Sequence, residues 1–267
     1  MNKKVLCLGI VIAFTLSQMT TPIFAQTQGA EMKLPLDTAE KIKVELNDCL
    51  RDGIITKAEK ETLKESATEE AIVALIEEKL DEVESVMEDN EHLQLAMGEV
   101  EATYTCDLGD GCSVIIELSD KEEGLTSVNL DQLSERATSG SNTLWKGYGN
   151  RYFTASATVD CVLGTAYMSL ENHYTLSSKG IDERYGETSC SGSNNKITIN
   201  AAAPVISDST ARTPGESDVD MYCNFTVKDG SNAAVKYKLS TTVGFVAINK
   251  TEEKIKVKQS WKLTKVS

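Results

Sequence analysis

Apolar residues recur at helical spacing through residues 37–97 of this chain. Asp37 or Thr38 is placed to cap a first helix that runs to about Arg51. The apolar positions that repeat every four residues along one side of it are Ile42, Leu46 and Leu50. The pattern therefore predicts an amphipathic helix at the start of this region.

Two further helices follow, each preceded by the sequence pattern of a capping box. Thr56 and Glu59 predict a short second helix that ends near Glu65, and Ser66 and Glu69 repeat the pattern for a third. The apolar positions of the third helix are Ile72, Leu75, Ile76, Leu80, Val83, Val86 and Met87. Its opposite face is acidic: Glu70, Glu77, Glu78, Asp81, Glu82, Glu84 and Glu88. Such a face is either the solvated side of a small helical unit or a negative docking surface for a basic partner.

The period changes from helical to alternating after residue 100. Two alternating runs flank the loop sequence DLGDG and predict a β-hairpin over residues 101–118. Asp107 and Asp110 in this loop are interpreted as turn formers, because Asp and Gly tolerate the backbone angles of a tight loop. Residues 119–143 are polar and end in a Ser/Gly/Asn cluster, which is typical of a linker.

From residue 144 the chain is rich in strand-forming residues. The candidate strands are Asn150–Val159, Gly164–Leu176, Lys196–Ala202, Asp220–Val227, Ala233–Val246 and Lys254–Lys265. No helical pattern separates them, which predicts an antiparallel β-sandwich over residues 144–267. The predicted fold class is therefore α+β, with an N-terminal acidic helical module (26–100) followed by a mainly antiparallel β-sandwich.

Residues 1–25 have the pattern of a signal peptide. Lys3 and Lys4 precede the apolar run Val5–Leu16, and Ala25 offers a small residue for cleavage. The apolar run is shorter than the ~20 residues that a transmembrane helix needs, so we expect a secreted, extracellular protein without membrane insertion. The net charge of −14 opposes binding to nucleic acid and to anionic membranes.

Six of the seven cysteines follow the predicted signal peptide, and an even number in an exported protein predicts disulfide bonds. They are Cys49, Cys106, Cys112, Cys161, Cys190 and Cys223. Cys106 and Cys112 bracket the DLGDG loop, so we expect them to pair and to staple the hairpin. The other pairings stay open. Cys49 either links the helices to the C-terminal part or leaves a free or intermolecular thiol.

The sequence contains no recognisable catalytic motif, so we expect a protein that is not an enzyme and that has no cofactor. His92 lies at the end of the acidic helical region, and His173 is interpreted as a half-buried residue of a strand. The stretch DCLRDGIITKAE (48–59) matches several positions of a calcium-binding EF-hand loop. However, Leu50 stands where that loop needs an oxygen ligand. We interpret the stretch as a corner between helices and predict no metal site.

The segment TLWKGYGNRYF (143–153) is the strongest candidate for a binding anchor. It gathers residue types that are enriched at interface hot spots, namely Trp145, Tyr148, Arg151, Tyr152 and Phe153. We expect these residues to hold a partner by aromatic burial and by hydrogen bonds from the arginine. The alternative interpretation is that the rings close one end of the β core.

Three segments also carry a family resemblance: DGIITKAE, the YxxxLGDGC hairpin from Tyr104 to Cys112, and GNRYFTA followed by YTLSSKGI. Together they resemble small uncharacterised secreted β-rich proteins of Gram-positive bacteria, and the resemblance transfers no functional residue. The function that we expect is non-catalytic recognition of a host or cell-surface macromolecule, an extracellular protein or a glycan. The alternatives are immunoglobulin-type binding through the acidic helices, and a secreted hydrolase of wall or glycan material.

Overall fold

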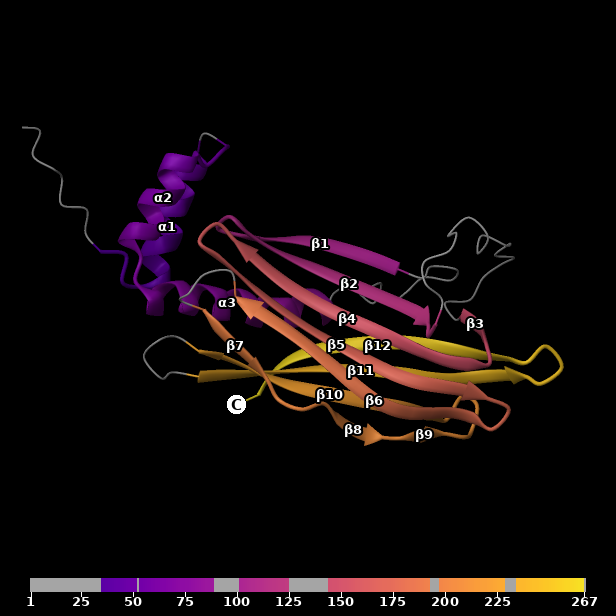
Figure 1. Cartoon of the computed structure of the whole chain (residues 1–267). Coiled ribbons are helices and arrows are strands. Elements are labelled where there is room, and N and C mark those ends of the chain that lie inside the picture. Colours follow the sequence, from indigo (N-terminus) through magenta and orange to yellow (C-terminus); the bar gives the residue numbers. More distant parts are fainter. Residues whose placement is uncertain are drawn as a thin grey trace, which may run out of the picture. The chain divides into compact units, whose positions relative to one another are not determined.

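The computed structural model describes residues 35–51, 53–88, 101–124, 144–192, 197–228 and 234–266 (Figure 1). The predicted signal peptide, His92 and residues 125–143 of the predicted linker lie outside these ranges. Among the described residues, no helix has both the length and the apolar character that crossing a membrane requires.

Three helices come first: α1 (Ala39–Leu50), α2 (Lys57–Ser66) and α3 (Glu69–Glu88). The predicted start of α1 is confirmed, because the side chain of Thr38 accepts a hydrogen bond from the backbone N–H of Lys41. The predicted capping box of α2 is confirmed as well. The Thr56 hydroxyl accepts from the N–H of Glu59, and the Glu59 carboxylate accepts from the N–H of Thr56.

The start of α3 differs from the prediction. The Ser66 hydroxyl donates to the carbonyl of Thr62 in the preceding helix, at 2.8 Å, and is not a cap. Instead, the Thr68 hydroxyl accepts from the N–H of Ala71. The predicted capping box of Ser66 with Glu69 is therefore wrong, because Ser66 still belongs to the last turn of α2.

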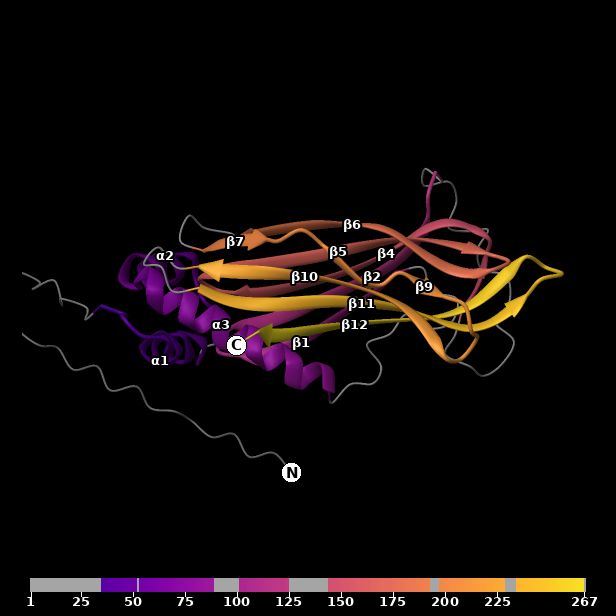
Figure 2. The same ribbon diagram turned by 90° about the horizontal axis from the view of Figure 1, so that it is seen from below.

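The other described elements are strands, which form two antiparallel sheets of six strands each (Figures 1 and 2). The first sheet has the order β1 (Glu101–Gly109), β2 (Cys112–Glu122), β4 (Gly149–Cys161), β5 (Gly164–Ser177), β6 (Gly180–Gly192) and β9 (Thr210–Ala211). The second has the order β3 (Leu144–Gly147), β12 (Lys254–Val266), β11 (Ala234–Asn249), β10 (Ser217–Lys228) and β7 (Thr198–Ala201), and β8 (Val205–Asp208) also pairs with β10. The expected strand-rich, mainly antiparallel class with helices is thus observed.

Each predicted strand overlaps an observed one, but β3, β6, β8 and β9 were not predicted, and β6 is the longest of these. Its inward positions are small or polar, among them Gly186, Thr188 and Cys190, so the segment lacks an apolar alternation. Gly186 shows the physical reason. A Cβ placed there would lie 2.2 Å from Sδ of Met221 and 2.8 Å from Cβ of Pro204, so these side chains occupy the space that a larger residue would need.

The predicted hairpin is present but longer than expected. β2 continues through Glu122, into the segment that we expected to be linker, and pairs along its length with β4. Cys112 lies opposite Cys161 in this pairing, and these two cysteines form a disulfide. The predicted Cys106–Cys112 bond is therefore wrong. Cys106 lies opposite Val114 in the β1–β2 register, too far along the strand to face Cys112.

The helices and both sheets share one hydrophobic core. Ile72, Leu75 and Ile76 of α3 are fully buried together with residues of the strands. The Tyr237 hydroxyl of β11 lies 3.2 Å from a carboxylate oxygen of Asp81 on α3, and the Lys265 ammonium of β12 lies 2.6 Å from the other. Residues 34–267 form one compact unit.

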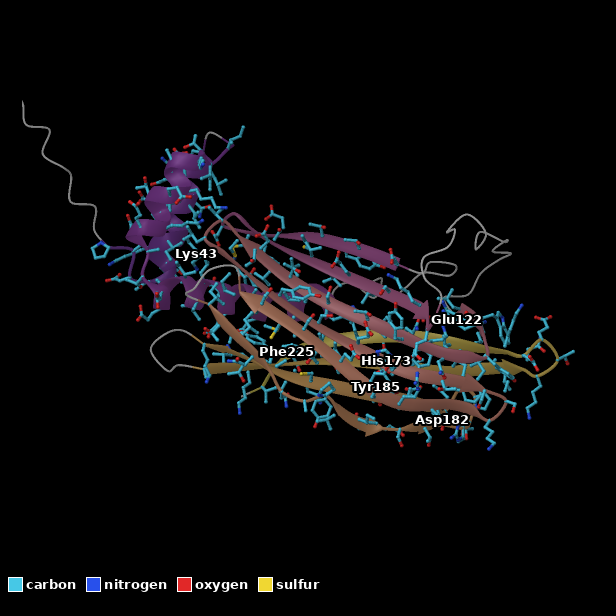
Figure 3. All side chains as sticks on the ribbon, in the orientation of Figure 1. Lys43, Glu122, His173, Asp182, Tyr185 and Phe225 are labelled. Carbon is cyan, nitrogen blue, oxygen red and sulfur yellow. A yellow bond between two sulfur atoms is a disulfide. The ribbon has the colours of Figure 1, made fainter. Side chains whose placement is uncertain are left out.

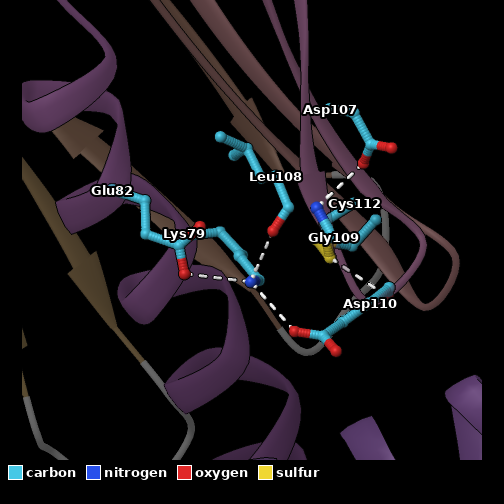
Figure 4. Close-up of a disulfide and its surroundings, with 8 residues drawn as sticks. Lys79, Glu82, Asp107, Leu108, Gly109, Asp110 and Cys112 are labelled. Carbon is cyan, nitrogen blue, oxygen red and sulfur yellow. Dashed lines mark hydrogen bonds and ion pairs between the residues drawn. A yellow bond between two sulfur atoms is a disulfide. The ribbon is translucent and has the colours of Figure 1, made fainter. Parts of the chain in front are cut away.

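The β1–β2 turn is tied to the helices by a buried lysine (Figure 4). The Lys79 ammonium of α3 donates to the carbonyl of Leu108 at 2.7 Å and forms ion pairs with Glu82 and Asp110 at 2.9 and 3.0 Å. Asp107 accepts from the N–H of Gly109 inside the turn. Both aspartates of the DLGDG loop are therefore used to shape and dock the turn, as their interpretation as turn formers predicts.

Candidate binding face on the first sheet

The predicted anchor segment is divided between the surface and the interior. Trp145 on β3 is 47% exposed, and Tyr148 and Tyr152 are half-buried. Arg151 and Phe153, by contrast, are 8% and 0% exposed. Successive side chains of a strand point to opposite faces, so Arg151 and Phe153 of β4 face the interior and Tyr152 faces outward. The structure therefore leaves Trp145, Tyr148 and Tyr152 as the members of the anchor that a partner can reach.

Arg151 belongs to a buried network of charged and polar groups between the sheets. Its Nε donates to Oδ1 of Asp120 at 3.1 Å, and the Tyr174 hydroxyl donates to the same oxygen at 3.1 Å. The Lys146 ammonium lies 2.9 Å from Oδ2 of this fully buried aspartate. The Tyr174 hydroxyl in turn accepts from Nε2 of Gln259, which belongs to the second sheet. Lys146 and Gln259 therefore connect the second sheet to this network, and Arg151 supports the network from the first sheet.

Burial and the negative charge of Asp120 have opposite effects on the pKa values of the basic groups in this network. Burial lowers the pKa of Lys146 despite the nearby carboxylate of Asp120. Burial is the largest single influence on the pKa of Arg151 and acts to lower it, but Asp120, Tyr174 and Glu122 together outweigh burial and raise that pKa. Burial and Asp120 both raise the pKa of Tyr174, which keeps its hydroxyl as a hydrogen-bond donor.

On the outward face of the same sheet, three rings form a row across neighbouring strands. Tyr152 of β4 lies opposite His173 of β5, which lies opposite Tyr185 of β6. The ring centroids are 5.5 Å apart for the first pair and 4.1 Å for the second, where the rings stack. The Arg184 guanidinium lies 5.3 Å from the Tyr185 centroid, and Figure 3 shows His173 and Tyr185 side by side. We call Tyr152, His173, Tyr185 and Arg184 the ring row.

Charged groups surround the ring row. Oε1 of Glu123 lies 2.7 Å from Nδ1 of His173 and accepts a hydrogen bond from Arg184. Arg184 and His173 together hold the pKa of the Glu123 carboxyl below its usual value. The ring row therefore combines a cation and a neighbouring carboxylate with its rings, and Tyr185 is 42% exposed.

One group of side chains in the described ranges has the spacing of a metal site, and it lies beside the ring row. It consists of Glu171, His173 and Glu187, whose ligand atoms all lie within 4.8 Å of one another. From the sequence, His173 is interpreted only as a half-buried sheet residue, and no metal site is predicted there. The alternation Glu171-Asn172-His173, which places the two outer residues on one face of a strand, is a signal that was available. Glu187 becomes a neighbour only through the β5–β6 register.

Two of the remaining cysteines lie on different sheets and are close enough to interact electrostatically. Cys190 lies on β6 of the first sheet, and Cys223 is buried on β10 of the second. Burial and the neighbouring Cys190 raise the pKa of the Cys223 thiol to about 11, which makes it unreactive at neutral pH. Cys49 and Cys106 are half-buried against the shared core.

The EF-hand-like stretch uses its carboxylates locally. The Glu59 carboxylate accepts from both the N–H and the hydroxyl of Thr56, and Asp48 pairs with Arg51 at 3.0 Å. Gly53 has a φ of 82°, which favours glycine and turns the chain between α1 and α2. Asp52 lies outside the described residues. The interpretation of the stretch as a helix corner agrees with these contacts.

Comparison with known proteins found no family model, no curated protein and no solved structure that matches this chain. The function must therefore be argued from the residues themselves.

Proposed function

We propose that this chain is a secreted, non-catalytic binding protein that recognises a host or cell-surface macromolecule through the outward face of the first sheet. In this proposal the two sheets are the layers of a β-sandwich, which supplies a rigid base for the face. The observation that carries the proposal is the ring row, where tyrosines and an arginine gather at the surface. These residue types dominate binding energy at protein interfaces.

The geometry of the ring row favours a protein as the partner over a glycan. Sugar rings bind by stacking on the flat face of an aromatic side chain. Here the faces of His173 and Tyr185 cover each other, and Arg184 lies over Tyr185. What the row offers outward is ring edges, a hydroxyl and charged groups, which suit the mixed apolar and polar contacts of a protein interface.

The alternative of binding through the acidic helices has less support. Several carboxylates of α3 already pair with cations of this chain: Glu78 with Lys43, Glu82 with Lys79, and Asp81 with Lys265. Each such pair reduces the negative charge that is left to attract a basic partner. In the ring row, Arg184 is likewise paired with Glu123, but Tyr185 is 42% exposed and so accessible to a partner.

The test is retention of a partner by immobilised protein from host extracellular fluid and from bacterial cell walls. We expect that Tyr185→Ser and Arg184→Ser each weaken the retained component at least tenfold, because truncating a hot-spot residue typically costs about 2 kcal/mol or more. The matched control is Tyr222→Ser on the second sheet, whose ring also carries a cation, Lys238, 4.1 Å from its centroid.

Three outcomes would contradict the proposal. One is equal retention by all variants. Another is a loss with Tyr222→Ser as large as that with Tyr185→Ser. The third is turnover of peptidoglycan or glycan by the purified protein, which would favour the hydrolase alternative.

A further inference from the structure

Three potential metal ligands converge on the outward face of the first sheet, on neighbouring strands. Glu171 and His173 are two residues apart on β5 and so lie on one face, and Glu187 of β6 lies directly opposite Glu171. Their ligand atoms lie within 4.8 Å of one another. Two strands of a sheet hold the backbones of all three, so the group does not depend on a flexible loop.

The imidazole of His173 is oriented as a metal ligand. The side chain is 6% exposed, and its Nδ1 faces Oε1 of Glu123 at 2.7 Å. With Nδ1–H donating to this carboxylate, the lone pair of the neutral ring is on Nε2. That atom is buried, lies 2.6 Å from Oε1 of Glu171 and has no hydrogen-bond partner among the described residues. A carboxylate behind the non-ligating nitrogen is the usual support of a metal-bound histidine.

The carboxylates of Glu171 and Glu187 repel each other, and a cation bound between them would remove this repulsion. Carboxylates directly opposite on paired strands repel each other. Glu171 is nevertheless held in place, because its Oε2 accepts a hydrogen bond from the Thr154 hydroxyl at 3.2 Å. Glu187 is exposed, so its side chain is free to move toward an ion. A divalent cation bound by one neutral imidazole and two carboxylates would give a group with no net charge.

We propose that Glu171, His173 and Glu187 bind one divalent transition-metal ion of the zinc class, with Glu123 and Thr154 as supporting residues. One nitrogen and two carboxylate oxygens are a ligand set that zinc accepts, with a fourth position left for water or for a donor from a partner. Calcium needs six to eight oxygens, which this group does not supply. The metal site goes beyond the proposed binding function and does not depend on it.

The experiment is calorimetric titration of zinc chloride into tag-free protein from which metal has been stripped with a chelator. We expect one zinc ion per chain, with weaker binding of manganese and no measurable binding of calcium. Glu187→Gln should weaken zinc binding at least tenfold, and because Glu187 is exposed this variant should fold normally. His173→Gln should abolish binding, and the supporting substitution Glu123→Gln should weaken it about 10- to 100-fold.

The matched control is His92→Gln, which removes the other histidine of the chain and should leave zinc binding unchanged. The proposal is overturned if the wild-type chain binds no zinc. It is equally overturned if His173→Gln and Glu187→Gln bind zinc as the wild type does, or if His92→Gln abolishes binding. Since the titration uses the metal alone, its result is separate from any failure of the ring row to retain a macromolecule.

Discussion

Asp120 carries a carboxylate with no solvent exposure, held by Arg151, Lys146 and Tyr174. Removing one member of a buried charge network leaves the remaining charges without a partner. The resulting loss of stability is larger than the net stabilisation that the intact network provides. We therefore expect Asp120→Asn to lower the free energy of unfolding by about 3 kcal/mol, measured by urea denaturation.

Glu122→Gln is the matched control for Asp120. This glutamate also approaches Arg151, at 3.6 Å, but its side chain is 47% exposed. Solvent screens such a pair, so the expected change is below about 1 kcal/mol. Equal effects of the two substitutions would show that Asp120 is not the centre of the network.

Glu183 is a second buried carboxyl, and its environment is unfavourable to charge. Neither of its carboxylate oxygens has a hydrogen-bond partner in the described structure. Burial and, to a smaller extent, Asp220 raise its pKa from 4.5 to about 8. Below pH 4.5 the group is protonated in both the folded and the unfolded chain and contributes nothing to the pH dependence. As the pH rises from 4.5 to 8, the unfolded chain loses this proton more easily, so folding becomes less stable.

The measurable consequence is a pH-dependent loss of stability that Glu183→Gln should remove. Between pH 4.5 and 8 the wild type should lose up to roughly 4 kcal/mol relative to this variant. Glu216→Gln, at an exposed glutamate, should keep the wild-type pH dependence. Parallel curves for the wild type and Glu183→Gln would mean that Glu183 titrates normally.

At the scale of elements, the Cys112–Cys161 disulfide closes the end of the β2–β4 pair. A cross-link of this kind stabilises mainly by restricting the unfolded chain. Replacing both cysteines by serine should therefore lower the free energy of unfolding by about 3 kcal/mol. Cys106→Ser is the control and should change stability far less. Peptide mapping that recovered a Cys106–Cys112 linked peptide would contradict the observed pairing.

The disulfide also shows which elements sequence could predict. The capping residues Thr38, Thr56 and Glu59 act within one helical turn, so α1 and α2 could be recognised locally. The partner of Cys112 depends on the strand register, which no local pattern contains. β6 was missed because neighbouring side chains leave room only for small inward residues at positions such as Gly186.

The same limit applies to the candidate site. The segment that contains Tyr152 could be chosen from composition, but strand alternation sends its neighbours Arg151 and Phe153 inward. His173 and Glu187 meet only because β5 and β6 pair in one register. Residue type alone therefore predicts Tyr152 of the ring row as a binding residue, but it predicts none of the proposed metal ligands.

At the scale of the whole molecule, α3 belongs to the same core as the strands. Ile76 is fully buried there, and replacing it by alanine leaves a cavity. We expect a loss of about 3 kcal/mol, with the helical circular dichroism and the tryptophan fluorescence changing at the same urea concentration.

The control for this prediction is Ile54→Ala, because the Ile54 side chain is 77% exposed. It should change stability by less than about 0.5 kcal/mol. If the helical signal of Ile76→Ala were lost at a much lower urea concentration than the fluorescence signal, the helices would unfold as a unit separate from the sheets.

The contacts of α3 with Tyr237 and Lys265 have a consequence for how the chain is made. The helix is synthesised early, but Tyr237 and Lys265 belong to β11 and β12, the last two strands that the structure describes. β12 also supplies the pairing for β3. In a growing chain, α3 therefore lacks these two contacts until β11 and β12 have emerged, and such contacts between segments distant in sequence slow folding. During that interval the incomplete chain is prone to aggregate. The yield of folded protein should therefore depend on chaperones that bind the chain before β12 is complete.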